Sequence, residues 1–253
     1  MTYLLETRDV SKSYGAFLAL DRVSMTLSDD EVLAVVGPNG AGKTTLVNLL
    51  TGLAAPTTGE VLLRGETIAG ATPVELADRG VARSFQLVQI FPRLTVAETI
   101  AAAVVTRQGK RWRLFANLAA DAAVAERVRE VAAIFGLQGR LGESAQLLSQ
   151  GEKKLLDVAS AFALDPQVML LDEPTSGIST ADKHRIMRTL IDAARRGGVK
   201  SLILVEHDMD LVAAYSDRIM ALSEGRVLAD LNPKEFFADP GIIATVVGKR
   251  REH

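Results

Sequence analysis

The chain has 253 residues, 48% of them hydrophobic and 24% charged, which is ordinary for a globular protein with a large core. The net charge of −2 argues against general coating of nucleic acid, and the absence of cysteine excludes disulfides, thiolate catalysis and cysteine-based metal sites. The N-terminus lacks the pattern of a signal peptide and no apolar run reaches about 18 residues, so we expect any membrane role to depend on a partner.

The first part of the chain is typical of strands. Ala19–Leu27 alternates loosely between apolar and polar residues, and Gly59–Gly65 is a short segment bounded by glycines. Glu31–Val36 continues as an apolar run after its first residue, which indicates a strand that is buried on both faces. A helix is predicted over Thr44–Leu50.

Beyond Thr95 the pattern becomes helical. Thr95-Val-Ala-Glu98 fits a capping box that opens a helix. Apolar residues at helical spacing run through Asn117–Phe135, and Gly136 follows as a candidate C-cap. This helical middle block is predicted to be an insertion in an α/β core.

The last third alternates between strands and helices. Strands are predicted at Val168–Leu171 and Ser201–Val205, with an amphipathic helix over Asp182–Arg196 between them. A strand, a helix and a strand in this order imply a parallel sheet. A hairpin is predicted where Arg218–Leu222 and Arg226–Ala229 flank a Glu224-Gly225 turn.

Gly37–Thr44, which reads GPNGAGKT, matches the phosphate-binding pattern G-x-x-x-x-G-K-[ST]. The match lies between a buried strand and a helix, where glycines let backbone N–H groups surround phosphate oxygens and the helix N-terminus adds positive charge. Lys43 would reach the β- and γ-phosphates, and the Thr44 hydroxyl would ligate Mg²⁺. The alternative is a glycine-rich turn beside a lysine. The predicted binding residues are Gly37, Pro38, Asn39, Gly40, Ala41, Gly42, Lys43, Thr44 and Thr45.

Two acids, Asp172 and Glu173, follow the Val168–Leu171 strand. A carboxylate at the C-terminal end of a parallel strand beside a P-loop can hold Mg²⁺ through water, which predicts that role for Asp172. Glu173 is then placed to act as the general base for the water that attacks the γ-phosphate. The alternative is that the acids cap the strand and begin a turn, since Pro174 comes next.

Leu148-Ser-Gln-Gly-Glu152 precedes a helix predicted over Lys153–Leu164. Ser149 and Glu152 have the spacing of a capping box, and a simple helix start is one interpretation. The other is a second anion site, formed by the Ser149 hydroxyl, the closely approaching Gly151 and the helix N-terminus. A second copy of the chain could bring this site to a phosphate held by the P-loop.

These motifs, with Gln86 and His207 in order between and after them, resemble the nucleotide-binding domain of ABC proteins over about residues 4–230. The resemblance implies an α/β fold, with a RecA-like P-loop NTPase core, an N-terminal antiparallel β subdomain and an inserted α-helical subdomain. It implies one domain over 1–253, with the core and the β subdomain in 1–87 and 161–253 and the helical subdomain in 88–160. It also implies ATP and Mg²⁺ as cofactors and ATP hydrolysis as the activity.

The resemblance implies further roles for single residues. Tyr14 would stack on adenine, unless it is only a strand-face tyrosine. Gln86 would sense Mg²⁺ and the attacking water and couple to the membrane subunit, and His207 would contact the γ-phosphate. The implied catalytic residues are therefore Glu173, His207 and Gln86, and the implied metal site consists of Thr44, Gln86 and Asp172.

In the family, two domains pair head to tail, so that each ATP lies between one P-loop and the signature motif of the other chain. Ser149 and Gly151 match that motif, Leu-Ser-Gly-Gly-Gln, whereas Gln150 and Glu152 depart from it. A glutamate near a γ-phosphate is expected to be mildly unfavourable unless its carboxylate is used in capping. Residues Ser176–Thr180 also lack the aspartate that the family often has there, which puts communication between the two sites in question.

Several stretches resemble one branch of the family, the ATP-binding subunits of branched-chain amino-acid importers and their urea and amide relatives. These stretches are Gly80–Gln86, Ile90–Val96, Val205–Asp210 and Asn232–Phe236. The implied partners are a second ABC ATPase subunit, identical or different, transmembrane permease subunits and, indirectly, a periplasmic solute-binding protein, with no nucleic acid. The implied location is peripheral, on the cytoplasmic face of the inner membrane. The alternatives are an exporter ATPase, for example of the lipopolysaccharide type, or a soluble ABC ATPase that acts on nucleic acid or ribosomes.

Overall fold

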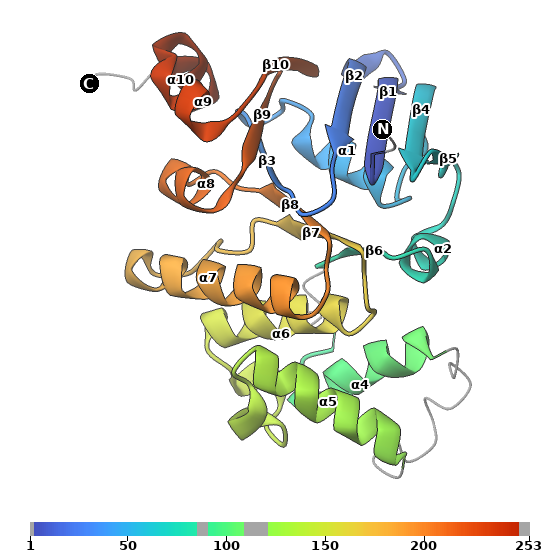
Figure 1. Cartoon of the computed structure of the whole chain (residues 1–253), viewed down its shortest axis with the longest axis vertical. Helices are drawn as coiled ribbons and strands as arrows, with labels where there is room; N and C mark the ends of the chain where they lie inside the picture. The colour runs from blue at the N-terminus through green and yellow to red at the C-terminus, as the bar shows by residue number, and fades with distance from the viewer. Residues whose placement is uncertain (1–2, 85–90, 109–120, 248–253) are drawn as a thin grey trace. The chain divides into compact units, whose positions relative to one another are not determined.

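The computed structural model describes residues 3–84, 91–108 and 121–247 (Figure 1). The chain divides into two compact units, one made of Met1–Leu76 with Lys200–His253 and the other of Ala77–Val199. Helix α2 (Pro73–Asp78) runs across the boundary between them. Among the residues that the structure describes, no helix is both long enough and apolar enough to cross a membrane.

The first unit begins with an antiparallel sheet in the strand order β2-β1-β4-β5. Its strands are β1 (Leu5–Tyr14), β2 (Phe17–Leu27), β4 (Thr58–Leu63) and β5 (Glu66–Thr67). The strands predicted over 19–27 and 59–65 are confirmed as β2 and β4. The turn between β1 and β2 contains Gly15 at a φ of 60°, which glycine adopts without steric cost. This sheet is the predicted antiparallel β subdomain.

The same unit contains a second group of strands. β3 (Val32–Val36) pairs in parallel with β8 (Ser201–Val205) and with β9 (Arg218–Ser223), and β9 pairs antiparallel with β10 (Arg226–Leu231). Every residue of β3 is buried, as its apolar run predicted, and every residue of β8 is buried as well. The β9–β10 hairpin turns at Glu224 and Gly225, both with positive φ, which matches the twist that a two-residue hairpin needs.

Helices cover these strands in the first unit. Helix α1 (Lys43–Leu50) follows β3, and α8 (Met209–Tyr215), α9 (Pro233–Ala238) and α10 (Pro240–Val247) come from the C-terminal segment. The last three lie beside β9 and β3 in Figure 1. Their apolar side chains pack against those strands in one buried cluster, which includes Ala34, Val36, Val212, Ile219, Ala221, Phe236 and Val246. Burial of this surface stabilises the carboxyl end of β3, where the P-loop begins.

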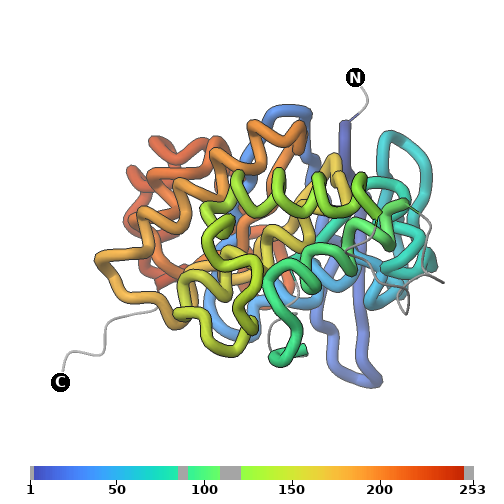
Figure 2. The backbone as a smooth tube through the Cα atoms, turned by 90° about the horizontal axis from the view of Figure 1, so that it is seen from below, coloured from blue at the N-terminus to red at the C-terminus, as the bar shows by residue number. Residues whose placement is uncertain are grey.

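The second unit holds a short parallel pair, β6 (Val81–Arg83) and β7 (Val168–Asp172), and four of the α-helices that the structure describes. These are α4 (Val96–Arg107), α5 (Ala122–Ile134), α6 (Gln150–Phe162) and α7 (Thr180–Arg196), with 3₁₀ turns at Gln138–Arg140 and Ala145–Leu147. Figure 2 shows α4, in green, and α5, in yellow-green, side by side. The capping box of Thr95 and Glu98 is present as predicted. Helix α5 ends before Gly136, as expected, whereas the start predicted at Asn117 lies outside the described residues.

The core of the second unit depends on a close contact between α6 and the end of α7. Phe135 and Phe162 are both buried and meet edge to face, with ring centroids 5.4 Å apart. Gly197 ends α7, and a Cβ at this position would lie 1.8 Å from the Phe162 ring. The glycine therefore both stops the helix and leaves room for the aromatic side chain.

Candidate active site

The segment between β3 and α1 forms a tight loop. Gly37, Gly40 and Gly42 have φ angles of 147°, 81° and 102°. A Cβ on Gly37 would lie 2.2 Å from the carbonyl oxygen of Leu222 in β9, and one on Gly42 would lie 2.6 Å from Cδ2 of Leu20 in β2. The glycines therefore allow both a left-handed backbone and close packing against two neighbouring strands.

Lys43 is the centre of this loop. Its side chain is almost fully buried, and its Nζ donates to the carbonyl oxygens of Gly37 at 2.7 Å and of Pro38 at 3.0 Å. Gly42 caps α1 without a side-chain hydrogen bond, and the first turn of the helix holds no acidic residue. The N-terminus of α1 thus keeps its partial positive charge beside a buried ammonium, which is an environment that suits an anion.

The loop glycines offer a test of this geometry. We expect Gly37→Ala to destabilise the protein by more than about 3 kcal/mol, because its Cβ would collide with the backbone of β9. Gly40→Ala should cost only about 1 kcal/mol, since it adds left-handed strain but no atom lies within 4 Å of the new Cβ. Urea unfolding of both variants measures the difference. Equal destabilisation would contradict the close packing of Gly37.

His207 lies at the same edge of the strands as the P-loop. In the parallel pair of β3 and β8, Val35 is opposite Val205, so the chain leaves both strands at one edge, toward Gly37 and His207. The backbone N–H of His207 donates to the carboxylate of the buried Glu206 at 3.1 Å. The His207 side chain is exposed. The first unit therefore places an imidazole at the edge from which the phosphate loop starts.

Tyr14 ends β1, and its ring is half exposed. The Nζ of Lys12 lies 5.1 Å from the centre of the ring, a cation–π contact that holds the ring at the surface. Lys12 is opposite Leu20, whose side chain approaches Gly42. Tyr14 is two residues beyond that point, or about 7 Å along the strand, so the β1–β2 hairpin carries an exposed aromatic ring close to the P-loop.

In the second unit, Asp172 is the last residue of β7 and Glu173 follows it. Nη2 of Arg83, on the neighbouring strand β6, lies 2.5 Å from the Asp172 carboxylate, and both side chains are largely buried. Glu173 has a φ of 47°, and its carbonyl oxygen accepts hydrogen bonds from the Ser176 N–H at 3.1 Å and from Lys154 Nζ at 3.2 Å. A turn begins at Glu173, as the alternative of strand-capping acids also expects, and the left-handed backbone there is uncommon for a residue with a Cβ. Gln86 lies outside the described residues.

Ser149 caps α6, and both bonds of the capping box with Glu152 are present. The Ser149 hydroxyl donates to Oε2 of Glu152 at 2.7 Å, and Nε of Arg140 lies 3.2 Å from the other carboxylate oxygen. The carboxylate is thus used in capping, and its charge is balanced by a guanidinium. Gly151 lies against α7, where a Cβ would come 3.3 Å from Ile186.

The hydrogen bond from the Ser149 hydroxyl lowers the pKa of Glu152, and the Ser149 N–H and Arg140 act in the same direction. The folded state therefore stabilises the charged form of the Glu152 carboxylate relative to the unfolded chain. Its stabilising contribution is present above about pH 4.3, the ordinary pKa of glutamate, and is lost as the pH falls through the lowered pKa.

We expect Glu152→Gln, which keeps a capping-box acceptor, to lower the free energy of unfolding by about 0.5 kcal/mol at neutral pH. Because the lost contribution belongs to the charged form, this difference should disappear in acid. Urea unfolding across pH measures it, with Glu126→Gln on the exposed side of α5 as the control. A difference between Glu152→Gln and the parent that does not change with pH would contradict the assignment.

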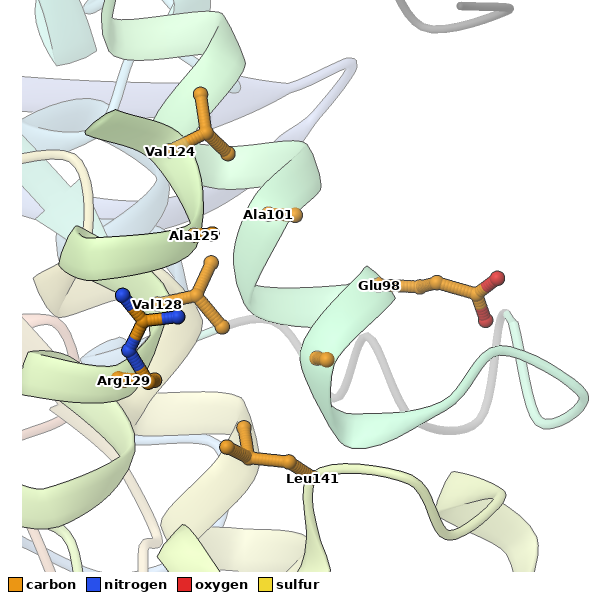
Figure 3. A pocket seen from close by; sticks show the side chains of 8 residues that line it. Glu98, Ala101, Val124, Ala125, Val128, Arg129 and Leu141 are labelled. Carbon is orange, nitrogen blue, oxygen red and sulfur yellow. The ribbon is translucent and has the colours of Figure 1, made fainter. Parts of the chain in front are cut away.

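A separate pocket of about 360 Å³ lies between α4 and α5 (Figure 3). Its walls are mainly apolar, from Ala101, Val124, Val128 and Leu141, with Arg129 beside them. The Glu98 side chain points away from these residues, and its carboxylate is engaged by Thr95 in the capping box. The pocket therefore offers no arrangement of groups suited to phosphoryl transfer.

The structure thus brings the predicted residues together in two groups. The P-loop, His207 and Tyr14 belong to the first unit, and Asp172, Glu173, Ser149 and Gly151 belong to the second. Sequence reasoning missed the contacts of Arg83, Lys154, Arg140 and Glu206. Arg83 lies within the Gly80–Gln86 stretch that the sequence had singled out, but no pattern in the sequence indicates its pairing with Asp172.

Comparison with known proteins shows that the chain is similar to members of one family. The family model described as "ABC transporter" matches residues 20–176. The high-affinity branched-chain amino acid transport ATP-binding protein LivG of Escherichia coli K12 is 32% identical, over 97% of this chain and 98% of LivG. The sulfate/thiosulfate import ATP-binding protein CysA 2 of Chromobacterium violaceum is 33% identical, over 96% of this chain and 63% of CysA 2. The crystal structure of the ADP conformation of MJ1267, an ATP-binding cassette of an ABC transporter, superposes with a TM-score of 0.88 at 25% identity, covering 98% of this chain and all of that one.

Proposed function

The chain belongs to the ABC transporter family as an ATP-binding subunit that hydrolyses ATP, and we propose that it drives solute import through partner membrane subunits. The proposed solutes are branched-chain amino acids or related small amides. The observation that carries the proposal is the preformed P-loop around the buried Lys43, in a chain similar to LivG over almost its whole length.

In the proposed site, residues 37–45 hold the phosphates of ATP. Lys43 already turns its ammonium into the loop, so little reorganisation is needed to meet the β- and γ-phosphates. The Thr44 hydroxyl and the Asp172 carboxylate, with the Gln86 amide, are oxygen donors of the kind that Mg²⁺ prefers. Bound Mg²⁺ would neutralise charge on the phosphates. The exposed ring of Tyr14 is proposed to stack on adenine.

For hydrolysis, we propose that the Glu173 carboxylate accepts a proton from the attacking water. His207 donates a hydrogen bond to the γ-phosphate as charge develops there, and Gln86 orients the water. The largely buried ion pair between Arg83 and Asp172 supports this assignment, because it holds the strand end from which Glu173 projects. Asp172 and Glu173 then both act from the end of strand β7, which the ion pair holds in place.

The site is proposed to be complete only when a second ATP-binding chain supplies its signature motif. Ser149 stands at the N-terminus of α6, where its hydroxyl and the Gly151 backbone could meet a phosphate that another chain holds. We propose that residues 1–253 act as one nucleotide-binding domain, with 88–160 as its helical part.

The name of CysA 2 favours import, and the name of LivG favours branched-chain amino acids as the solutes. LivG is named for transport of branched-chain amino acids and CysA 2 for import of sulfate or thiosulfate. The match with LivG, at 32% identity over 97% of this chain, supports the amino-acid branch. We propose that the partners are permease subunits and, through them, a periplasmic solute-binding protein, with the chain on the cytoplasmic face of the inner membrane. Nucleic acid is not among the proposed partners.

The proposed solute class can be tested with the assembled transporter in proteoliposomes that contain its solute-binding protein. We expect ATP hydrolysis to rise when leucine, isoleucine or valine is added on the side of the binding protein. Sulfate is the comparison solute, and an assembly that carries Glu173→Gln is the control for the ATPase. Stimulation by sulfate without any response to the amino acids would contradict the assignment.

A further inference from the structure

Lys154 joins the helix that carries the signature motif to the proposed general base. It lies early in α6, whose N-cap is Ser149, and its side chain is partly buried. Its Nζ donates to the backbone carbonyl oxygen of Glu173 at 3.2 Å. Lys154 thus contacts the main chain of Glu173, just beyond the end of β7.

The backbone of Glu173 needs such support. Its φ of 47° is left-handed, which costs roughly 1–2 kcal/mol for a residue with a Cβ. Because Pro174 follows, the main alternative for Glu173 is an extended backbone, since a residue before proline avoids the right-handed helical region. A change to that alternative would turn the Glu173 side chain in another direction.

Two hydrogen bonds oppose this change. The Ser176 N–H donates to the Glu173 carbonyl from within the same turn, whereas Lys154 donates from a different helix. A bond from an ammonium is charge-assisted and stronger than a bond between neutral groups. It also ties the orientation of the carbonyl to the position of α6. The Ser176 N–H belongs to the same turn and could move together with Glu173. The Lys154 ammonium is attached to α6 and does not move with the turn.

We propose that Lys154 is a positioning residue, which holds Glu173 in the left-handed conformation that aims its carboxylate. This inference rests on the proposed role of Glu173 as the general base. Helix α6 would then contribute to two nucleotide sites. Ser149 at its start would meet the nucleotide of another chain, and Lys154 would position the base for this chain's own nucleotide. This connection between the two nucleotide sites through α6 does not involve Ser176–Thr180, where the family's aspartate is missing.

The test compares Lys154→Met, Lys154→Arg and the control Lys153→Met, which removes the same charge from the neighbouring position. ATP hydrolysis by the full-length chain is normalised to the number of ATP-binding sites found by titration, so that partial unfolding does not appear as slow turnover. We expect Lys154→Met to lower kcat tenfold or more, equivalent to about 1.4 kcal/mol, with KM for ATP changed less than twofold. Lys154→Arg should restore kcat to within about threefold of the parent, since arginine keeps a donor, and Lys153→Met should stay near the parent.

The double variant Lys154→Met with Glu173→Gln separates positioning from a general structural role. We expect it to hydrolyse ATP no more slowly than Glu173→Gln alone, because the base that Lys154 positions is already absent. A parental kcat in Lys154→Met, or a further tenfold loss in the double variant, would overturn the inference. If Glu173→Gln alone keeps the parental kcat, the proposed base fails and the inference with it. If Glu173→Gln abolishes turnover while Lys154→Met has no effect, only the inference fails.

Discussion

Glu173→Gln is expected to lower ATP turnover by at least about 100-fold while ATP binding persists. The substitution removes the proposed proton acceptor but keeps the size of the side chain and leaves the P-loop untouched. The backbone of Glu173 is held by the Ser176 N–H and by Lys154, and these bonds do not involve the carboxylate. A steady-state phosphate-release assay measures turnover, and Glu126→Gln on the exposed side of α5 is the control for loss of one charge.

The same variant should accumulate an ATP-bound dimer. If ATP binds between two chains and is no longer hydrolysed, the closed dimer should persist, and size-exclusion chromatography with ATP should show it. Where the natural partner is a different chain, the dimer should appear when that chain is added. A monomer under both conditions, together with unchanged turnover, would rule out Glu173 as the base.

Lys43→Ala is expected to reduce ATP affinity by roughly 100-fold, about 3 kcal/mol, because it removes the main charged contact with the β- and γ-phosphates. Lys43 is almost fully buried and hydrogen-bonded to the carbonyls of Gly37 and Pro38, so its loss also leaves those acceptors without this donor. Titration with a fluorescent nucleotide measures the affinity. Lys234→Ala on the surface of α9 is the control, and thermal melting confirms that the variant is folded. Unchanged affinity in a folded Lys43→Ala variant would contradict the predicted phosphate contact.

The sequence predicted those parts of the fold that depend on local patterns. The apolar run before Gly37 is a fully buried strand, β8 has the predicted bounds, and Glu224-Gly225 is the turn of a hairpin. The helix predicted to start at Lys153 begins at Gln150, in agreement with the capping-box spacing of Ser149 and Glu152. Periodicity locates the apolar face of a helix, whereas the first turn depends on a cap whose residues are polar.

Other features depend on contacts between distant parts of the chain. The short strand β6 has no pattern of its own and forms because β7 pairs with it. The ion pair of Arg83 with Asp172 and the bond from Lys154 to Glu173 join residues that are far apart in sequence, and the left-handed backbone of Glu173 has no signature in a glutamate followed by proline. The roles of Lys43 and Glu173 stay predictions, which variants of these two residues test.

The structure changes the interpretation of Glu152, which departs from the signature motif of the family. In the sequence it is a negative charge where the family has a glutamine, and it is expected to be mildly unfavourable near a γ-phosphate. In the structure its carboxylate completes the cap of α6 and lies beside Arg140. Its charge is therefore partly neutralised before any nucleotide approaches, which reduces the expected penalty.

Purification of the tagged chain from detergent-solubilised membranes, after nuclease treatment, shows whether this chain hydrolyses ATP on behalf of membrane subunits. We expect integral membrane permease subunits to co-purify, and we expect the complex to hydrolyse ATP with the parental chain but not with Glu173→Gln. Recovery with ribosomes or nucleic acid instead of membrane subunits, or equal hydrolysis by the Glu173→Gln complex, would contradict it.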